Sequence, residues 1–147
     1  YDMPILYSCH PRSKKRLEAS GFELDRRVIR HEPLGFHDYN CLQMNAFAVV
    51  SDSGTLPEES SFFTSIGLLI PAVCIRTSTE RPEALDAGTV KLVGTDHDLI
   101  VNEVSRLLED KTYYDKMSYA VNPYGDGKAC NRIVRALKGE DVERYGA

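Results

Sequence analysis

Several hallmarks of membrane proteins and nucleic-acid-binding proteins are missing from this sequence of 147 residues. No apolar run approaches the roughly 20 residues of a membrane-spanning helix, and no stretch has the pattern of a signal peptide. The net charge is −4 and no basic patch is interleaved with aromatic residues, which argues against nucleic acid as a partner. Internal repeats and low-complexity segments are absent as well. With 42% hydrophobic and 27% charged residues, the composition is typical of one globular domain with a substantial core.

The four cysteines are widely spaced, which does not suit a metal site. Cys9, Cys41, Cys74 and Cys130 form no CxxC pair. Cys9 and Cys74 lie in apolar runs, so we expect reduced, buried thiols rather than disulfides or metal ligands. Reduced thiols in turn predict a cytoplasmic protein without a metal centre.

Short apolar runs alternate with helical patterns along the whole chain. The expected strands are residues 3–9 (buried), 27–30, 46–50, 72–75 and 89–93. The expected helices are residues 12–19, 39–45 with Asp38 as cap, 57–66, 82–87, 98–109, 113–120 and 129–138. The side chains expected to face the core include Leu42, Met44, Ile100, Val104, Leu107, Leu108, Ile133, Val134 and Leu137. The alternation predicts an α/β protein: a Rossmann-like parallel sheet with helices on both faces.

The most informative stretch is residues 46–88. An apolar run stops at the polar loop 51–55, and Pro57, Glu58 and Glu59 then begin a helix. Hydroxyl and carboxylate side chains before this helix can cap its free N–H groups. A second apolar run ends at Arg76 and a hydroxyl-rich turn. α/β proteins build anion-binding crevices in this way, but neither a Walker loop nor a GxGxxG fingerprint is present. Spacing alone therefore predicts only a phosphate-facing loop.

Three candidate groups fall at the carboxyl ends of expected strands, where ligands bind in such sheets. They are His10, residues 53–55 and residues 76–80. Ser53, Gly54 and Thr55 can present a hydroxyl and backbone N–H groups to a phosphate, with Gly54 allowing close approach. A capped strand-to-helix turn is an equally good interpretation of the same three residues.

Each of the other candidates also has a structural alternative. Glu59 can accept hydrogen bonds from two vicinal ribose hydroxyls, or it can simply favour the helix N-terminus. Arg76 can clamp a diphosphate bidentately, or pair on the surface with Glu80 or Glu83. His10 can donate to phosphate or transfer a proton, although a lone histidine is more often structural.

Three long motifs carry a resemblance to a known family. SDSGTLPEE, CIRTSTERPEALDAGTVKLVGTD and NPYGDGKACNRIVRAL, with His10-Pro11-Arg12 near the start, resemble the non-hydrolysing UDP-N-acetylglucosamine 2-epimerases. The resemblance spans almost the whole chain. It implies two Rossmann-like domains in the glycosyltransferase-B arrangement, with a nucleotide sugar between them. This chain resembles the second domain without its first strand and helix. Residues 1–121 would bind the nucleotide, and residues 122–147 would form a turn and helix that cross to the first domain.

The resemblance also implies roles for single residues. His10 matches a family histidine that faces the nucleotide sugar and is the catalytic candidate. Residues 53–55 match the diphosphate loop, usually Ser-Gly-Gly, and Thr55 here replaces the second glycine. Glu59 matches the glutamate that binds the ribose, which leaves Glu58 to complement the helix dipole. Arg76 matches an arginine that contacts the ligand.

Further matches surround these positions. Leu34 and Tyr39 match the positions that flank the uracil, where glutamine and an aromatic residue are common in the family. Tyr39 can stack, whereas Leu34 can offer only backbone or apolar contact. Thr79, Glu80 and Arg81 continue a matching segment and are expected to support the residues that touch the ligand.

The reaction implied by the resemblance inverts carbon 2 of a UDP-N-acetylhexosamine. UDP is eliminated and then added back, without a redox or metal cofactor, in the synthesis of surface polysaccharide sugars. The expected ligand is UDP-N-acetylhexosamine or UDP, and the full-length enzyme would be a homodimer. The motifs resemble most the capsule and O-antigen branch that serves N-acetylfucosamine. This chain alone is expected to be inactive. The alternatives are an inactive UDP-binding fragment and the nucleotide-binding half of a glycosyltransferase.

Overall fold

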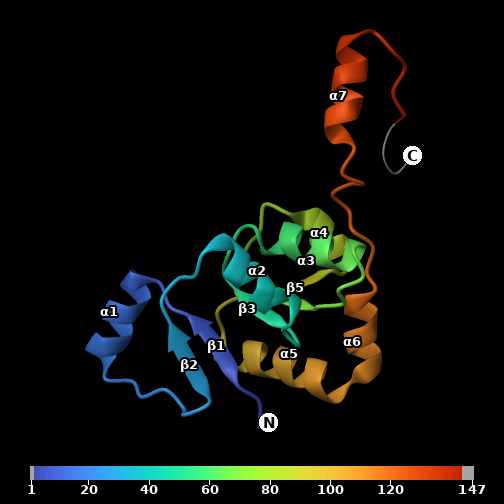
Figure 1. Ribbon diagram of the computed structural model, residues 1–147. Helices are drawn as coiled ribbons and strands as arrows, with labels where there is room; N and C mark the ends of the chain where they lie inside the picture. Colours follow the sequence, from blue (N-terminus) through green and yellow to red (C-terminus); the bar gives the residue numbers. More distant parts are fainter. Residues whose placement is uncertain (1, 144–147) are drawn as a thin grey trace. The chain divides into compact units, whose positions relative to one another are not determined.

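The computed structural model describes residues 2–143, and the chain divides into two compact units between Leu42 and Gln43. Each unit contains parallel strands joined by helices (Figure 1). The first unit contains the parallel pair β1-β2, and the second contains the parallel order β3-β4-β5. Among the described residues, no helix combines the length and the apolar composition that a bilayer crossing requires.

The first unit pairs β1 (Ile5–Ser8) with β2 (Val28–His31) through the helix α1 (Pro11–Ser20). Nδ1 of His10 caps α1 by accepting a hydrogen bond from the backbone N–H of Arg12 at 3.2 Å. α1 ends at Gly21, whose φ of 66° lies in the left-handed region that glycine adopts readily. The expected burial of the first strand is wrong, since β1 is mostly exposed. A two-stranded sheet with one connecting helix covers little of its strands.

Helix α2 (Phe36–Met44) begins three residues earlier than expected, so Asp38 lies within its first turn instead of capping it. Leu42 and Met44 are 37% and 39% exposed, whereas Gln43 between them is only 4% exposed. The expectation that the two apolar residues adjoin the core is therefore wrong. In this last turn the Gln43 amide points inward and donates a hydrogen bond to Glu59. The apolar pattern of the sequence gives no sign of this bond.

The second unit is built on three parallel strands, with β4 (Ala72–Cys74) between β3 (Val49–Ser51) and β5 (Val90–Leu92). Ala72 lies opposite Val49 on one side and Val90 on the other. All of β4 is buried, as is typical of a central strand in a parallel sheet. The connecting helices are α3 (Leu56–Ser65) and α4 (Pro82–Ala87).

Successive side chains of β4 point to opposite faces, and a separate core forms on each face. One core gathers Leu56, Ala72, Cys74, Ala84 and Val90 under α3 and α4. The other gathers Val73, Val93, Leu107 and Met117 under α5 (His97–Glu109) and α6 (Lys111–Ser118). Figure 1 shows α3 and α4 on one side of these strands and α5 on the other. Cys9 and Cys74 are buried thiols outside any disulfide, as predicted, while Cys41 and Cys130 are exposed and likewise form no disulfide.

The amphipathic face predicted for α5 is confirmed, with Leu107 buried and its apolar neighbours half-buried. The same face also carries a carboxylate, Glu103, which is 8% exposed. The hydroxyl of Tyr113 on α6 donates to Oε1 of Glu103, and the guanidinium of Arg106 lies 3.6 Å from the Tyr113 ring centroid. Burial, followed by the bond to Glu103, raises the pKa of Tyr113 to about 12. This polar contact joins α5 to α6 beside the second core.

Helix α7 (Ala129–Leu137) contains no buried residue. Ile133, Val134 and Leu137 are 58%, 51% and 84% exposed, so the expectation that they point inward is wrong. The periodicity correctly identified the apolar side of the helix. Burial needs a second element packed on that side, however, and a sequence pattern cannot show one.

Replacing Tyr113 by phenylalanine should destabilise the second unit by about 1–3 kcal/mol at neutral pH, because the buried Glu103 carboxylate loses its donor. The pKa of Tyr113 is raised in the folded state, so its protonation stabilises the fold below pH 10, the ordinary value. This contribution fades as the pH rises through about 12. Urea unfolding at several pH values should show a smaller alkaline loss of stability in the variant than in the wild type; a loss remains because Tyr114 and Tyr124 also have raised pKa values.

The control for this experiment is Tyr119→Phe, because the Tyr119 side chain is 67% exposed. We expect its free energy of unfolding to stay within about 0.5 kcal/mol of the wild type. Equal losses in the two variants would show that the Tyr113–Glu103 bond contributes nothing particular to stability.

Candidate functional site

The carboxyl ends of β3 and β4 bring Gly54 and Arg76 together. Gly54 follows β3 and Arg76 follows β4, and neighbouring parallel strands end at the same edge of a sheet. A Cβ atom added to Gly54 would lie 3.6 Å from Nη1 of Arg76. The guanidinium therefore lies against the one residue of this loop that has no side chain. A cation and an accessible backbone meet here, as an anion site requires.

Hydroxyl groups organise the loop before α3. The backbone N–H of Ser53 donates to Oγ of Ser51 at 3.0 Å, and the N–H of Thr55 donates to Oγ of Ser53 at 3.3 Å. Thr55 occupies the N-cap position of α3, yet its side chain makes no capping bond. Its hydroxyl instead donates to Oε1 of Glu59 at 2.7 Å. The structure thus contains a hydroxyl-bonded turn, and the contact of this loop with phosphate stays a prediction.

Glu59 lies one helical turn beyond Thr55, half-buried at the start of α3. Its other oxygen, Oε2, accepts a hydrogen bond from the Gln43 side-chain amide at 2.8 Å. Each oxygen of the carboxylate therefore has a neutral donor. Neither partner is cationic, so the charge of the carboxylate is not balanced by them and can attract a further hydrogen-bond donor.

Arg76 forms one of the two ion pairs that the sequence left open. Its Nη1 and Nη2 lie 3.3 and 3.5 Å from the carboxylate oxygens of Glu80. A backbone hydrogen bond, together with the Arg76 charge, lowers the pKa of Glu80. A guanidinium has five N–H donors, so this pair leaves donors for a second anion. The ion pair and a diphosphate contact are compatible roles for Arg76.

Glu58 does more than complement the helix dipole, and that interpretation is corrected. Its carboxylate accepts a hydrogen bond from Nε of Arg81, which ties the first turn of α3 to the start of α4. The bond to Glu58 raises the pKa of Arg81. The backbone N–H of Arg81 also donates to Oγ1 of Thr79 at 3.1 Å. Thr79, Glu80 and Arg81 therefore shape the loop after β4, and their service to a ligand stays a prediction.

The remaining candidates belong to the first unit. His10 is exposed, and because its Nδ1 accepts from Arg12, the neutral ring carries its proton on Nε2. Leu34 is 39% exposed in the loop before α2, and Tyr39 is half-buried within α2. The convergence of these three residues with those of the second unit stays a prediction. Among residues 2–143, no cluster of three or more His, Cys, Asp or Glu side chains is arranged to hold a metal.

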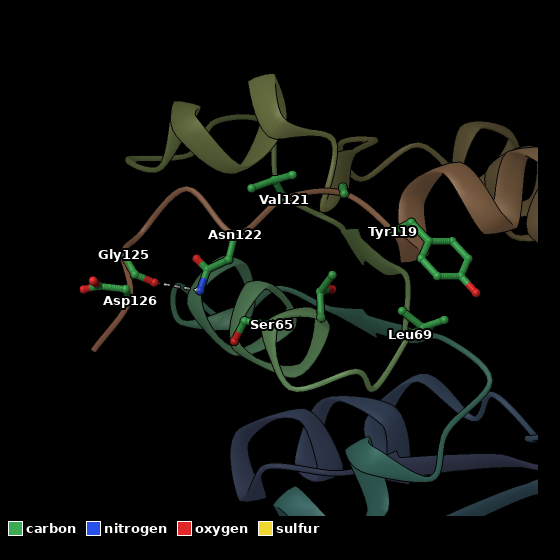
Figure 2. A pocket seen from close by; sticks show the side chains of 9 residues that line it. Ser65, Leu69, Tyr119, Val121, Asn122, Gly125 and Asp126 are labelled. Carbon is green, nitrogen blue, oxygen red and sulfur yellow. Dashed lines mark hydrogen bonds between the residues drawn. The ribbon is translucent and has the colours of Figure 1, made fainter. Parts of the chain in front are cut away.

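A hollow of about 410 Å³ opens at the other end of α3 (Figure 2). Thr64 and Ser65 of α3 line it, together with residues from the segment that follows α6. In that segment the Asn122 amide donates to the Gly125 carbonyl at 3.4 Å, as Figure 2 shows. α3 has 10 residues, which corresponds to about 15 Å of helix. The hollow is therefore separate from the loop that holds Gly54.

Comparison with known proteins decides the family. The family model described as UDP-N-acetylglucosamine 2-epimerase matches residues 1–138. The chain belongs to this family. It is 46% identical over 117 residues to the UDP-N-acetylglucosamine 2-epimerase of Escherichia coli K12, covering 80% of this chain and 30% of that enzyme. The Campylobacter jejuni epimerase is 37% identical over 145 residues, covering 97% of this chain and 36% of the relative.

Solved structures of epimerases support the same assignment. The co-structure of S. aureus MnaA with UDP has a TM-score of 0.84 and 32% identity, covering 99% of this chain and 40% of that one. The Neisseria meningitidis epimerase bound to UDP-GlcNAc has a TM-score of 0.77 and 33% identity, and the match covers 93% of this chain and 36% of that one. The α/β class and the glycosyltransferase-B type of fold are thereby confirmed. This chain spans about a third of the length of the curated relatives it matches.

The roles of two residues near this edge could not be predicted from the sequence. Gln43 stands between Leu42 and Met44, and the apolar pattern of this segment gives no signal for a buried amide. For Glu58 the sequence indicates only a role at the helix dipole, because its partner, Arg81, is 23 residues away in the chain. No local pattern reports either contact. The placement in the capsule and O-antigen branch stays a prediction.

The variant Glu58→Gln tests whether the ion pair with Arg81 holds the loop after β4. We expect lower thermal stability than the wild type at low salt, because Arg81 loses its ionic partner. The difference should shrink in about 1 M salt, where charges are screened beyond about 3 Å. Differential scanning calorimetry at both salt concentrations measures this. Glu83→Gln, in the exposed first turn of α4, is the control and should show a smaller salt-dependent change.

Proposed function

We propose that this chain supplies the UDP-binding part of a UDP-N-acetylhexosamine 2-epimerase. The observation that carries the proposal is the contact of the Arg76 guanidinium with Gly54 at the strand ends. The start of α3 lies beside it, where a helix dipole favours an anion. Two similar structures contain UDP or UDP-GlcNAc, which supports the same ligand here. In this proposal Arg76 and residues 53–55 bind the diphosphate.

In this proposal Glu59 binds the ribose of the nucleoside. Glu59 is a charged acceptor one turn into α3, suited to two adjacent ribose hydroxyls. Tyr39 offers an aromatic face for the uracil, and Leu34 an apolar contact. Thr79, Glu80 and Arg81 keep the loop of Arg76 in place through the bonds described above.

The reaction proposed for the whole protein is elimination and re-addition of UDP with inversion at carbon 2, in surface polysaccharide synthesis. Removing and returning a proton on opposite faces requires an acid and a base with tuned pKa values. Within this chain His10 is the candidate for one of these groups: Nδ1 caps α1, so Nε2 is the ring nitrogen proposed to take part in proton transfer. The carboxylates that the resemblance assigns to the first domain would supply the rest. No metal or redox step is part of this proposal.

We also propose that residues 1–121 form the nucleotide-binding domain and residues 122–147 cross to the first domain. The doubly wound strand order 3-2-1-4-5-6 contains the neighbours 2-3 and 4-5-6. The pair β1-β2 and the order β3-β4-β5 match these two groups if the first strand lies outside this chain. The exposed apolar side chains of α7 support the crossing. The full-length enzyme is proposed to be a homodimer.

Isothermal titration calorimetry with UDP, UMP and uridine tests the binding proposal. Affinity should rise with each phosphate, because Arg76 and the loop at Gly54 act on the diphosphate. Arg76→Lys should weaken UDP binding by about tenfold and leave uridine unchanged, since lysine cannot bind bidentately. Arg132→Lys, which alters the ion pair with Asp126 beyond the site, is the matched control. Equal affinity for uridine and UDP would contradict the proposed diphosphate site.

A second experiment concerns catalysis by this chain alone. With stoichiometric protein in heavy water, proton NMR of UDP-N-acetylglucosamine should show no deuterium at carbon 2, because the opposing acid–base groups are absent. If exchange occurs, His10→Asn gives the diagnosis, since asparagine keeps a cap for α1 but lacks the imidazole. Exchange that disappears in His10→Asn would show that the domain carries its own base.

A further inference from the structure

The Glu59 carboxylate has a donor on each of its oxygens. Oε2 accepts from the Gln43 amide at 2.8 Å, and Oε1 accepts from the Thr55 hydroxyl at 2.7 Å. Hydrogen bonds to an ionised acceptor are stronger than neutral ones and fix its direction. The three side chains come from the end of α2, the loop before α3 and the first turn of α3. The rotamer of Glu59 is therefore set before any ligand arrives.

Burial distinguishes the two donors. Gln43 is 4% exposed, whereas Thr55 is exposed to solvent. Burying an amide is unfavourable unless it is hydrogen-bonded, and the last turn of α2 buries this amide while Leu42 and Met44 remain exposed. A ligand or water can compete with the Thr55 hydroxyl for Glu59. The Gln43 amide is protected from that competition, so it is the permanent support of the carboxylate.

The direction of the hydroxyl bonds also follows from the geometry. A threonine hydroxyl has a single proton, and Thr55 uses it on Glu59. In the 3.0 Å contact between the two hydroxyls, Ser53 is consequently the donor and Thr55 the acceptor. The Ser53 hydroxyl therefore donates to Thr55, and the Thr55 hydroxyl donates to the Glu59 carboxylate. A diphosphate that drew the Ser53 proton to itself would leave the Gln43 bond undisturbed.

We propose that Gln43 is a positioning residue that orients Glu59 to accept the two adjacent ribose hydroxyls of a nucleoside diphosphate. This inference rests on the proposed function. An ionised carboxylate has about four lone-pair sites, and Gln43 and Thr55 occupy one on each oxygen. One site per oxygen remains, which matches a diol with two neighbouring donors. A carboxylate already held in place loses less rotamer freedom on binding, and so binds the diol more tightly.

The test compares UDP with 2′,3′-dideoxy-UDP, which lacks both hydroxyls, by calorimetry on the 147-residue chain. Wild type should prefer UDP. Gln43→Met keeps the length of the side chain and removes the donor, so UDP affinity should fall by about tenfold while dideoxy-UDP affinity is unchanged. In a Glu59→Gln background, Gln43→Met should have no further effect, because Gln43 acts only through Glu59. Leu42→Met, on the exposed side of α2, is the matched control and should alter neither affinity.

The possible outcomes separate this inference from the proposed function. Wild-type protein that binds neither nucleotide, or binds both equally, overturns the proposed function at Glu59 and this inference with it. Preference for UDP in the wild type that Gln43→Met leaves intact overturns the positioning role alone. An equal fall in both affinities also overturns it, since that result indicates a structural role. If Gln43→Met does not fold, Gln43→Asn is compared with the wild type in its place. Its side chain is one methylene shorter, so UDP affinity should fall while dideoxy-UDP affinity is unchanged.

Discussion

The parallel alignment of β3, β4 and β5 is the constraint on which the second unit depends. A parallel strand pair cannot be closed by a tight turn, so each connection must cross over one face of the sheet, and here α3 and α4 make these crossings. Since β4 is buried on both faces, it separates two cores and fixes both layers of helices. The same alignment places the carboxyl ends of β3 and β4 at one edge. The site is a consequence of that arrangement.

Three carboxylates stand close to this edge, and each is stabilised differently. Glu58 pairs with Arg81 and Glu80 pairs with Arg76, so their charges are balanced by guanidinium groups. Glu59 is bound by the neutral donors Gln43 and Thr55. Neutral donors leave the charge of a carboxylate unbalanced, so it attracts a ligand donor strongly. In an ion pair the guanidinium already offsets most of the carboxylate charge. This difference supports Glu59, rather than its neighbours, as the group for ribose hydroxyls.

Backbone-level features of this chain could be predicted well because they depend on nearby residues. Gly21 and Gly88 end their helices in the left-handed conformation, and Pro82 begins α4 where expected. The alternation of apolar runs and amphipathic segments was sufficient for the α/β class, and the motifs around residues 51–88 were sufficient for the family. Pattern and motif both act over short distances in the chain. The candidate residues Gly54 and Arg76 followed from the rule that parallel strands end together.

The sequence by itself therefore determined the order of the elements, the fold class, the family and the strand-end position of the candidate site. Only the tertiary structure decided which side of a helix is covered and which charged groups meet. It buried Gln43 rather than Leu42 or Met44, and it paired Glu58 with Arg81 across 23 positions. Local propensity sets backbone conformation, because each residue restricts its own torsion angles. Burial and ion pairing depend on the elements that fold against a residue from elsewhere in the chain, and no local pattern encodes them.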